Sequence, residues 1–170
     1  GGPFDKARQR PNEAGTKLLL CPGGVQIYYG DESGRSLIIP GTEGDATLRS
    51  FMNWDELAGN AKRNGFAAQD VLAHWQKLGR FRQAHPAVGA GVHTLLSEQP
   101  YVFKREYKNA RLEDKVVVGL DLPKGKKTVR VAGVFVDGAV LQDYYSGKKV
   151  QVRGGAVTVD SKFDIVLLGQ

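Results

Sequence analysis

The spacing of apolar residues changes after Gly91, and this change constrains the fold more than any other feature of the chain. Beyond it, apolar and polar residues tend to alternate, as they do in strands with one buried face. Turn residues such as Asp137-Gly138 and Ser146-Gly147 recur every eight to twelve residues, which is typical of an antiparallel β-sandwich. The predicted strands are His93–Ser97, Tyr101–Tyr107, Lys115–Leu122, Thr128–Phe135, Val140–Tyr145, Lys149–Arg153, Ala156–Val159 and Asp164–Leu168.

The earlier part of the chain follows a helical period instead. A first helix is predicted from the N-cap Asn12 to Cys21, just before Pro22-Gly23-Gly24. A second is predicted over residues 66–84, where Val71, Trp75 and Leu78 share one apolar stripe. The long glycine-rich stretch at residues 35–64 is predicted to be a loop, and long loops often carry function.

Val25–Tyr29 is a continuous apolar run with strong β preference, which favours a strand buried on both faces of a parallel sheet. One such strand cannot satisfy its own edges, so it needs neighbouring strands that this sequence does not supply. We therefore expect α/β plus all-β architecture: residues 1–88 as the end of a larger α/β domain, and residues 89–170 as the β-sandwich. The chain lacks a starting Met, and we expect a processed chain or a piece of a longer protein.

Composition excludes several classes of protein. The 170 residues are 41% hydrophobic, so the chain is not intrinsically disordered, and one Cys excludes an internal disulfide or a cysteine-based zinc site. No apolar run is long enough to cross a membrane. The net charge of +6 is spread along the chain, and the small cluster Lys124, Lys126 and Lys127 is interpreted as a solvated turn. We expect no nucleic-acid partner and no membrane partner.

Two groups of residues are candidates for a binding site. Asp31 and Glu32 follow the predicted strand, either as a polar strand end or as a wall of a site. Adjacent carboxylates on an extended chain point to opposite sides, so they do not form the opposed pair that glycoside hydrolysis requires. Asp45 and Arg49 either pair with each other on the surface or grip a hydroxyl-rich ligand, for which Trp54 offers an apolar platform.

Residues 22–32, Pro-Gly-Gly-Val-Gln-Ile-Tyr-Tyr-Gly-Asp-Glu, resemble glycoside hydrolase family 13, the alpha-amylase family. In that family a similar sequence motif lies on the eighth strand of a (β/α)8 barrel, also called a TIM barrel. The resemblance continues in Asp45-x-x-x-Arg49-x-x-Met52-x-Trp54, in the stretches His74–Leu78 and His85–Ala87, and in the β-rich tail. The residues of these motifs are most similar to those of periplasmic bacterial alpha-amylases.

The resemblance implies the last strand and helices of a barrel followed by a C-terminal β-sandwich. It implies a parent enzyme that hydrolyses internal α-1,4-glucosidic bonds of starch and maltodextrin with retention. The family's three catalytic carboxylates lie on earlier strands, so the resemblance implies no catalytic residue here and no activity of this chain alone. Its calcium ligands also lie mainly upstream, so we expect no metal and no cofactor in this chain.

By the same resemblance, Asp45 and Arg49 contact glucose units, whereas Asp31 and Glu32 orient neighbouring loops. The implied partners are an α-glucan and the rest of the barrel, and the implied location is periplasmic or secreted. One alternative is a non-catalytic sandwich that binds glucan through tyrosines such as Tyr101. Another is a sandwich that only stabilises the barrel, with Trp75 and Phe81 as the seam.

Overall fold

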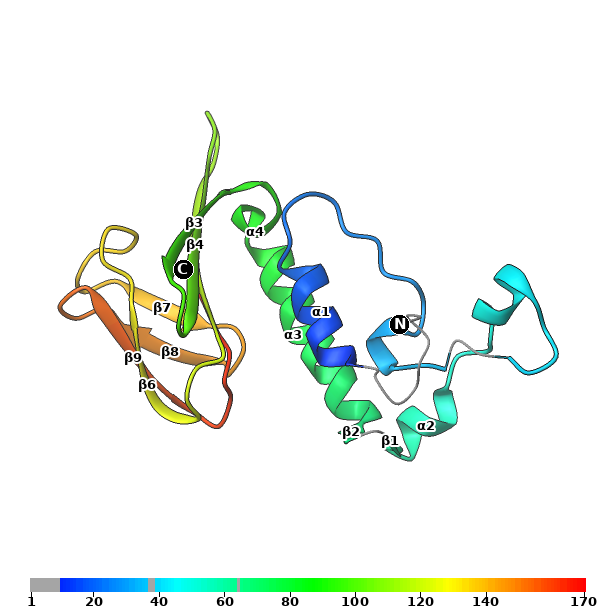
Figure 1. Ribbon diagram of the computed structural model, residues 1–170. Coiled ribbons are helices and arrows are strands. Elements are labelled where there is room, and N and C mark those ends of the chain that lie inside the picture. Colours follow the sequence, from blue (N-terminus) through cyan, green and yellow to red (C-terminus); the bar gives the residue numbers. More distant parts are fainter. Residues whose placement is uncertain (1–9, 37–38, 64) are drawn as a thin grey trace. The chain divides into compact units, whose positions relative to one another are not determined.

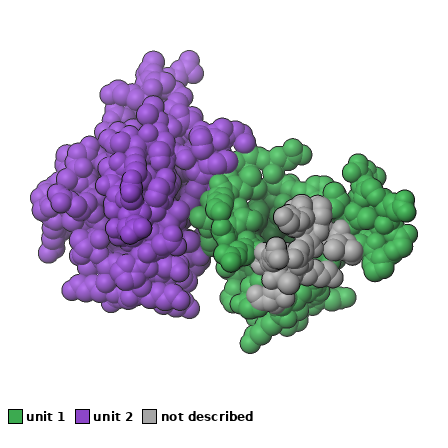
Figure 2. All heavy atoms as spheres, in the orientation of Figure 1, with its two compact units in different colours: residues 1–19, 25–76 green, residues 20–24, 77–170 purple. Residues whose placement is uncertain are grey.

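The computed structural model describes residues 10–36, 39–63 and 65–170. The chain forms two compact units, drawn in different colours in Figure 2. Unit 1 comprises residues 1–19 and 25–76, and unit 2 comprises residues 20–24 and 77–170. The predicted domain limit at residues 88 and 89 refers to the barrel of the parent enzyme and stays a prediction.

Unit 2 contains the β-sandwich, whose strands are all antiparallel to their neighbours (Figure 1). A six-stranded sheet has the order β3-β4-β5-β10-β7-β8, and β6 pairs with β9 in a second sheet. The strands are β3 (Val92–Ser97), β4 (Tyr101–Lys108), β5 (Glu113–Leu120), β6 (Gly125–Arg130), β7 (Val140–Asp143), β8 (Lys148–Gln151), β9 (Ala156–Ser161) and β10 (Val166–Gly169).

The two sheets enclose one apolar core. The six-stranded sheet contributes Val117, Leu141 and Leu168, and the two-stranded sheet contributes Val129 and Val157. Burying both inner faces is the main stabilising contribution in a sandwich, at about 25 cal/mol per Å2 of apolar surface. The sandwich prediction and all eight predicted strands are confirmed, with shifted ends.

The largest shift concerns the predicted strand Thr128–Phe135. The strand β6 ends at Arg130, because the amides of Val134 and Phe135 both donate to the carbonyl of Val131 and close a turn. Val131 and Val134 are nevertheless buried, so the apolar pattern there reflects a turn that folds into the core. A strand and a buried turn give similar short patterns in a sequence.

The last turns of helix α3 (Ala68–Ala84) and the short helix α4 (Pro86–Ala90) belong to unit 2. Helix α4 contacts β4 and β5. Arg82 donates to the carbonyls of Cys21 and Gly23, with 2.7 Å to the former, and the amide of Gly23 donates to the Gly89 carbonyl at 2.8 Å. These bonds attach residues 20–24 to unit 2.

In unit 1, helix α1 (Pro11–Leu19) packs on the first turns of α3, so both predicted helices are confirmed. The indole nitrogen of Trp75 donates to the Pro11 carbonyl at 3.0 Å, and the imidazole of His74 lies 3.0 Å from the Thr16 hydroxyl. Gly15 permits this packing, because a Cβ there would lie 2.8 Å from the Trp75 ring. The predicted cap Asn12 is the second residue of the helix, which begins at Pro11.

The prediction of a buried strand at Val25–Tyr29 is wrong for this chain. The segment lies outside every strand, and Ile27, Tyr28 and Tyr29 are 46%, 40% and 43% exposed. No described strand pairs with it, and an unpaired strand would leave its amides and carbonyls without partners. No barrel sheet is therefore formed by the described residues, in which the sandwich is the main sheet structure.

The stretch predicted as a long loop contains several short elements. These are the 3-10 turn η3 (Gly44–Leu48), helix α2 (Trp54–Ala58) and strand β1 (Lys62–Arg63). The 3-10 turn η2 (Asp31–Ser33) precedes the stretch, and β2 (Phe66–Ala67), which pairs with β1, follows it. Within the described ranges, no helix has the length and apolar character needed to span a membrane.

Candidate functional site

The candidate site lies in unit 1, on the segments that follow Val25–Tyr29. Gly30 adopts a left-handed conformation with φ of 91°, and its amide donates to the Glu32 carboxylate at 2.9 Å. Glu32 therefore closes the turn η2 on which it lies. The predicted role of Glu32 in supporting neighbouring loops stays a prediction, because this contact lies within its own turn.

Asp31 shares the same turn and is half-buried. Burial raises the pKa of its carboxyl group, and the nearby charge of Glu32 adds to the shift. Hydrogen bonding to the Tyr28 backbone and the charge of Arg35 act in the opposite direction. Both adjacent carboxyl groups thus interact with the backbone of this turn, Asp31 at Tyr28 and Glu32 at Gly30.

Arg35 joins this turn to the stretch at residues 48–50. It is only 3% exposed, and its guanidinium donates to the carbonyls of Tyr29 and Ser50 at 3.0 Å each and of Leu48 at 3.2 Å. Its Cζ also lies 4.1 Å from the centroid of the Tyr29 ring. A planar guanidinium has several fixed donors, so one side chain can fix three carbonyls at once.

The two tyrosines strengthen the same connection. The Tyr29 hydroxyl donates to the Ser50 carbonyl at 3.0 Å, and the Tyr28 hydroxyl to the Leu48 carbonyl at 3.4 Å. Their rings lie 4.8 Å apart. Gly30 leaves room for this arrangement, because a Cβ there would lie 2.3 Å from the Arg35 side chain.

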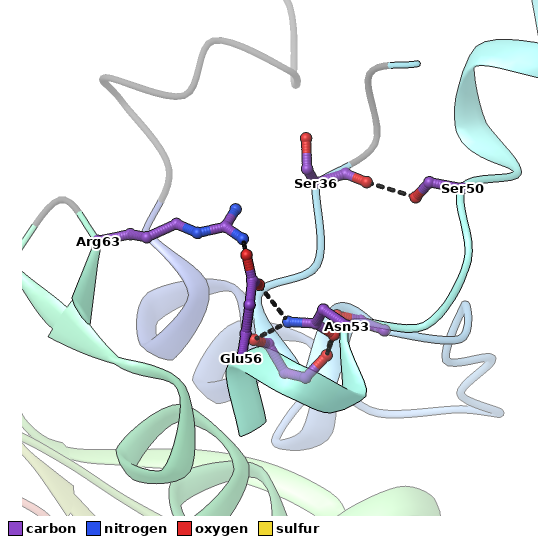
Figure 3. A network of polar contacts seen from close by, with 7 residues as sticks. Ser36, Ser50, Asn53, Glu56 and Arg63 are labelled. Atoms are coloured by element: carbon purple, nitrogen blue, oxygen red, sulfur yellow. Dashed lines mark hydrogen bonds and ion pairs between the residues drawn. The ribbon is translucent and has the colours of Figure 1, made fainter. Parts of the chain in front are cut away.

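A second polar network fixes the start of helix α2, as Figure 3 shows. The Ser33 hydroxyl donates to the Asn53 side-chain oxygen at 2.6 Å, and the Asn53 amide donates to the Glu56 carboxylate at 2.8 Å. Glu56 also forms an ion pair with Arg63. The hydroxyl of Ser50 donates to the Ser36 carbonyl at 2.6 Å in the same view.

These networks place the predicted ligand-contacting residues at exposed positions. Asp45 lies within η3, Arg49 directly follows it, and Trp54 is the first residue of α2 with 67% of its surface exposed. In the described structure Asp45 and Arg49 form no ion pair with each other, which leaves both charged groups open to solvent or a ligand. Asp45, Arg49 and Trp54 thus lie in one stretch of the chain, residues 45–54. In the described structure no hydrogen bond or ion pair joins their side chains directly.

Sequence reasoning missed Arg35, Ser33 and Asn53 as organising residues. The nearest signal was the placement of Arg35 just after a polar turn that follows two tyrosines. An arginine, a serine and an asparagine in a glycine-rich loop are common, so their types alone do not indicate that they fix its shape. Among the described residues, no group of three or more His, Cys, Asp or Glu side chains could hold a metal ion.

Comparison with known proteins shows a similarity to a curated protein. A periplasmic alpha-amylase of Escherichia coli strain K12 is 43% identical over 112 residues, which are 65% of this chain and 15% of that protein. No family model matches the chain. The aligned region is therefore a small part of the relative's length.

Solved structures agree on the fold. The alpha-amylase of Geobacillus thermoleovorans, solved with acarbose, covers 96% of this chain with a TM-score of 0.60 and 19% identity. AmyP in complex with maltose covers 94% with a TM-score of 0.61 and 20% identity. In each case the matched region is 34% of the solved chain. At these identities the likeness shows a shared fold.

Proposed function

We propose that this chain is the C-terminal portion of an alpha-amylase, an enzyme of glycoside hydrolase family 13. The parent enzyme hydrolyses internal α-1,4-glucosidic bonds of starch and maltodextrin with retention of configuration. The observation that carries the proposal is the 43% identity over 112 residues to a periplasmic alpha-amylase. That relative also supports a periplasmic or secreted location.

The structure of unit 1 supports the proposal that residues 25–29 pair with strands from another part of the parent enzyme. Ile27, Tyr28 and Tyr29 are large apolar side chains left exposed in a segment without a neighbouring strand. In our proposal the segment is the eighth strand of a (β/α)8 barrel, and strands from the rest of the parent enzyme pair with both of its edges. Burial of these side chains then adds about 25 cal/mol for each Å2 of apolar surface removed from water.

We assign no catalytic residue to this chain. Retaining hydrolysis needs two carboxyl groups about 5–5.5 Å apart on opposite sides of the sugar. Asp31 and Glu32 are sequence neighbours on one 3-10 turn, and Glu32 already accepts a hydrogen bond from Gly30. The resemblance assigns the catalytic carboxylates and the calcium ligands of the family to upstream segments, so the isolated chain is inactive and needs no cofactor.

Substrate contact is proposed for the exposed residues held by the two networks. Asp45 and Arg49 can each bind adjacent sugar hydroxyls with two oxygens or two nitrogens, and the Trp54 ring can cover an apolar sugar face. All three are exposed, as a site open to an α-glucan requires. Asp31 and Glu32 act as support for the loops that carry them.

The test uses the full-length protein that contains this chain. We expect release of reducing sugar from soluble starch, with products initially in the α configuration in a proton NMR time course. Trp54→Ala and Arg49→Ala should raise KM with a smaller effect on kcat, and Lys62→Ala, at an exposed position, is the control. Products initially in the β configuration would contradict retention, and unchanged KM values would contradict the sugar contacts.

A role of the sandwich in stabilising the barrel is also supported by one observation. Within unit 2, the Phe81 ring of α3, a helix that our proposal assigns to the barrel, lies 5.4 Å from the Tyr144 ring. Trp75, the other residue of the predicted seam, instead packs on α1 within unit 1. Tyr144 and Tyr145 are engaged in ring contacts, which makes them poor candidates for glucan stacking.

A further inference from the structure

Positive charge is concentrated in one stretch of the sandwich. Residues 124–162 contain eight Lys or Arg and three Asp, so they carry +5 of the net charge of +6. This stretch includes β6, β8 and β9. The positive charge is therefore less evenly spread along the chain than the net value suggests.

Most cations of this stretch are exposed and form no ion pair within the described part of the chain. Lys127 is the exception, because it is buried and donates to the carbonyls of Gly125 at 2.7 Å and Ser161 at 2.8 Å. Among the described residues, Lys126, Arg130 and Lys149 form no ion pair. Part of the cluster interpreted as a solvated turn is thus a buried structural lysine, and the rest lies on an exposed face.

The lysines of β4 and β5 differ, since each has a carboxylate partner. Lys104 pairs with Glu106 at 2.6 Å, and Lys108 and Lys115 both pair with Glu113 at 2.8 Å. The same domain therefore neutralises lysines in one region and leaves them unneutralised in another. The lack of carboxylate partners is therefore a feature of residues 124–162 and not of every surface lysine in the domain.

The three acids of the basic stretch do little to neutralise it. Asp143 is buried and accepts hydrogen bonds from backbone amides, including that of Leu167 at 2.9 Å. Asp137 accepts from the amides of Gly154 and Gly155. Asp160 is exposed on β9, where it is the cross-strand partner of Lys126.

A groove of about 450 Å3 lies on this face and combines cations with hydroxyl groups. Its lining includes Thr128 and Thr158, whose hydroxyl oxygens lie 3.5 Å apart across β6 and β9. Lys149 and Arg153 line it from β8 and the turn that follows, beside Gln151. Such a lining suits a ligand that has both hydroxyl and anionic groups.

We propose that this face, formed by Lys126, Thr128, Lys149, Arg153 and Thr158 and here named the basic face, binds an anionic polysaccharide. The cations attract its phosphate, sulfate or carboxylate groups, and the threonine hydroxyls bond to its sugar hydroxyls. A lipid headgroup would use the cations but not the paired hydroxyls within a groove. The binding is independent of the proposed hydrolysis, because none of these residues belongs to the candidate site.

The test measures binding of the 170-residue chain to dextran sulfate, with uncharged dextran as the reference polymer. The variant K126Q/K149Q/R153Q lowers the net charge by three, as does the control variant K104Q/K108Q/K115Q on the neutralised region. We expect at least a tenfold loss of affinity for the first and less than a threefold loss for the second. Binding should also weaken steeply between 50 and 200 mM salt, as for other charge-driven polymer contacts.

Equal losses in the two variants would overturn the proposal, because net charge alone would then account for binding. Binding to phosphatidylglycerol vesicles without binding to dextran sulfate would overturn it in favour of a membrane. If a variant fails to fold, amide chemical shifts of the unmodified chain replace it as the readout. Dextran sulfate should then shift the amides of residues 126–130 and 149–158 and leave those of 104–115 unchanged, and the reverse pattern would overturn the proposal.

Discussion

Arg35 and Tyr29 are joined twice, since the guanidinium carbon lies 4.1 Å from the ring centroid while Nε donates to the Tyr29 carbonyl at 3.0 Å. The remaining nitrogens of Arg35 reach Leu48 and Ser50. A single buried cation thus fixes the loop that leads to Asp45 and Arg49. The shape of the candidate site therefore depends on a residue that is itself buried.

Replacing Arg35 should loosen this loop. Arg35→Ala leaves several carbonyls without their donors, and each unsatisfied group costs about 1–3 kcal/mol when it stays buried. We expect faster hydrogen exchange and faster proteolysis at residues 44–53. Arg35→Lys keeps the charge but loses the planar set of donors, so it should give an intermediate effect. Exchange rates equal to those of the unmodified chain would contradict this role.

Asp114 should stabilise unit 2 through two contacts at once. Its carboxylate lies 2.8 Å from His85 Nδ1 and accepts from the Ala87 amide at 2.8 Å, so it anchors the junction between α3 and α4 to β5. Asp114→Ala should lower the free energy of unfolding by about 2–4 kcal/mol, because one buried donor and one buried imidazole lose their partner. Urea denaturation followed by circular dichroism measures the change.

The control for that measurement is Asp160→Ala, at an exposed position on β9. A surface substitution away from buried partners usually changes the free energy of unfolding by no more than about 0.5 kcal/mol. Similar effects of the two variants would show that the His85–Asp114 contact makes no special contribution.

The carboxyl group of Glu113 should titrate at unusually low pH. Hydrogen bonds from Lys108 and Lys115 lower its pKa to about 2. A lowered pKa means that the favourable interaction is present above the unfolded-state pKa and is lost as the pH falls towards 2. Carbon-13 NMR titration should show this value, and 1 M salt should raise it because the pair is exposed. A pKa near 4.5 at low salt would contradict the ion-pair geometry.

Two glycine substitutions in helices should have opposite effects. Gly15→Ala places a Cβ 2.8 Å from the Trp75 ring and should destabilise unit 1 by about 1–3 kcal/mol. Gly79→Ala in α3 meets nothing within 4 Å and should stabilise by about 0.5–1 kcal/mol through helix propensity. Thermal unfolding monitored by circular dichroism distinguishes them. A stabilising Gly15→Ala would contradict the close contact of α1 with Trp75.

The sandwich could be predicted because its signals are local. Alternation and turn residues locate the strands, and only their ends moved, as at β6, where a buried turn continues the apolar pattern. Helix α3 was likewise evident from its apolar stripe. The pairing order of the strands could not be predicted, since it depends on contacts between residues far apart in the chain.

The error at Val25–Tyr29 has the same physical origin. The composition of the segment favours a strand, but a strand forms only where neighbours satisfy its backbone groups. Motif and residue type select Asp45, Arg49 and Trp54 as candidates, and their contact with sugar stays a prediction. The contacts of Arg35 and of the Ser33–Asn53 pair could not, because they are set by loop geometry.

In our proposal, this chain completes the barrel of a starch-hydrolysing enzyme whose reacting carboxylates lie outside it. The most direct test of this claim is the release of reducing sugar from soluble starch by two purified proteins, the 170-residue chain and the full-length protein that contains it. We predict release by the full-length protein and none by the chain. Release by the chain alone, or none by the full-length protein, would contradict the claim.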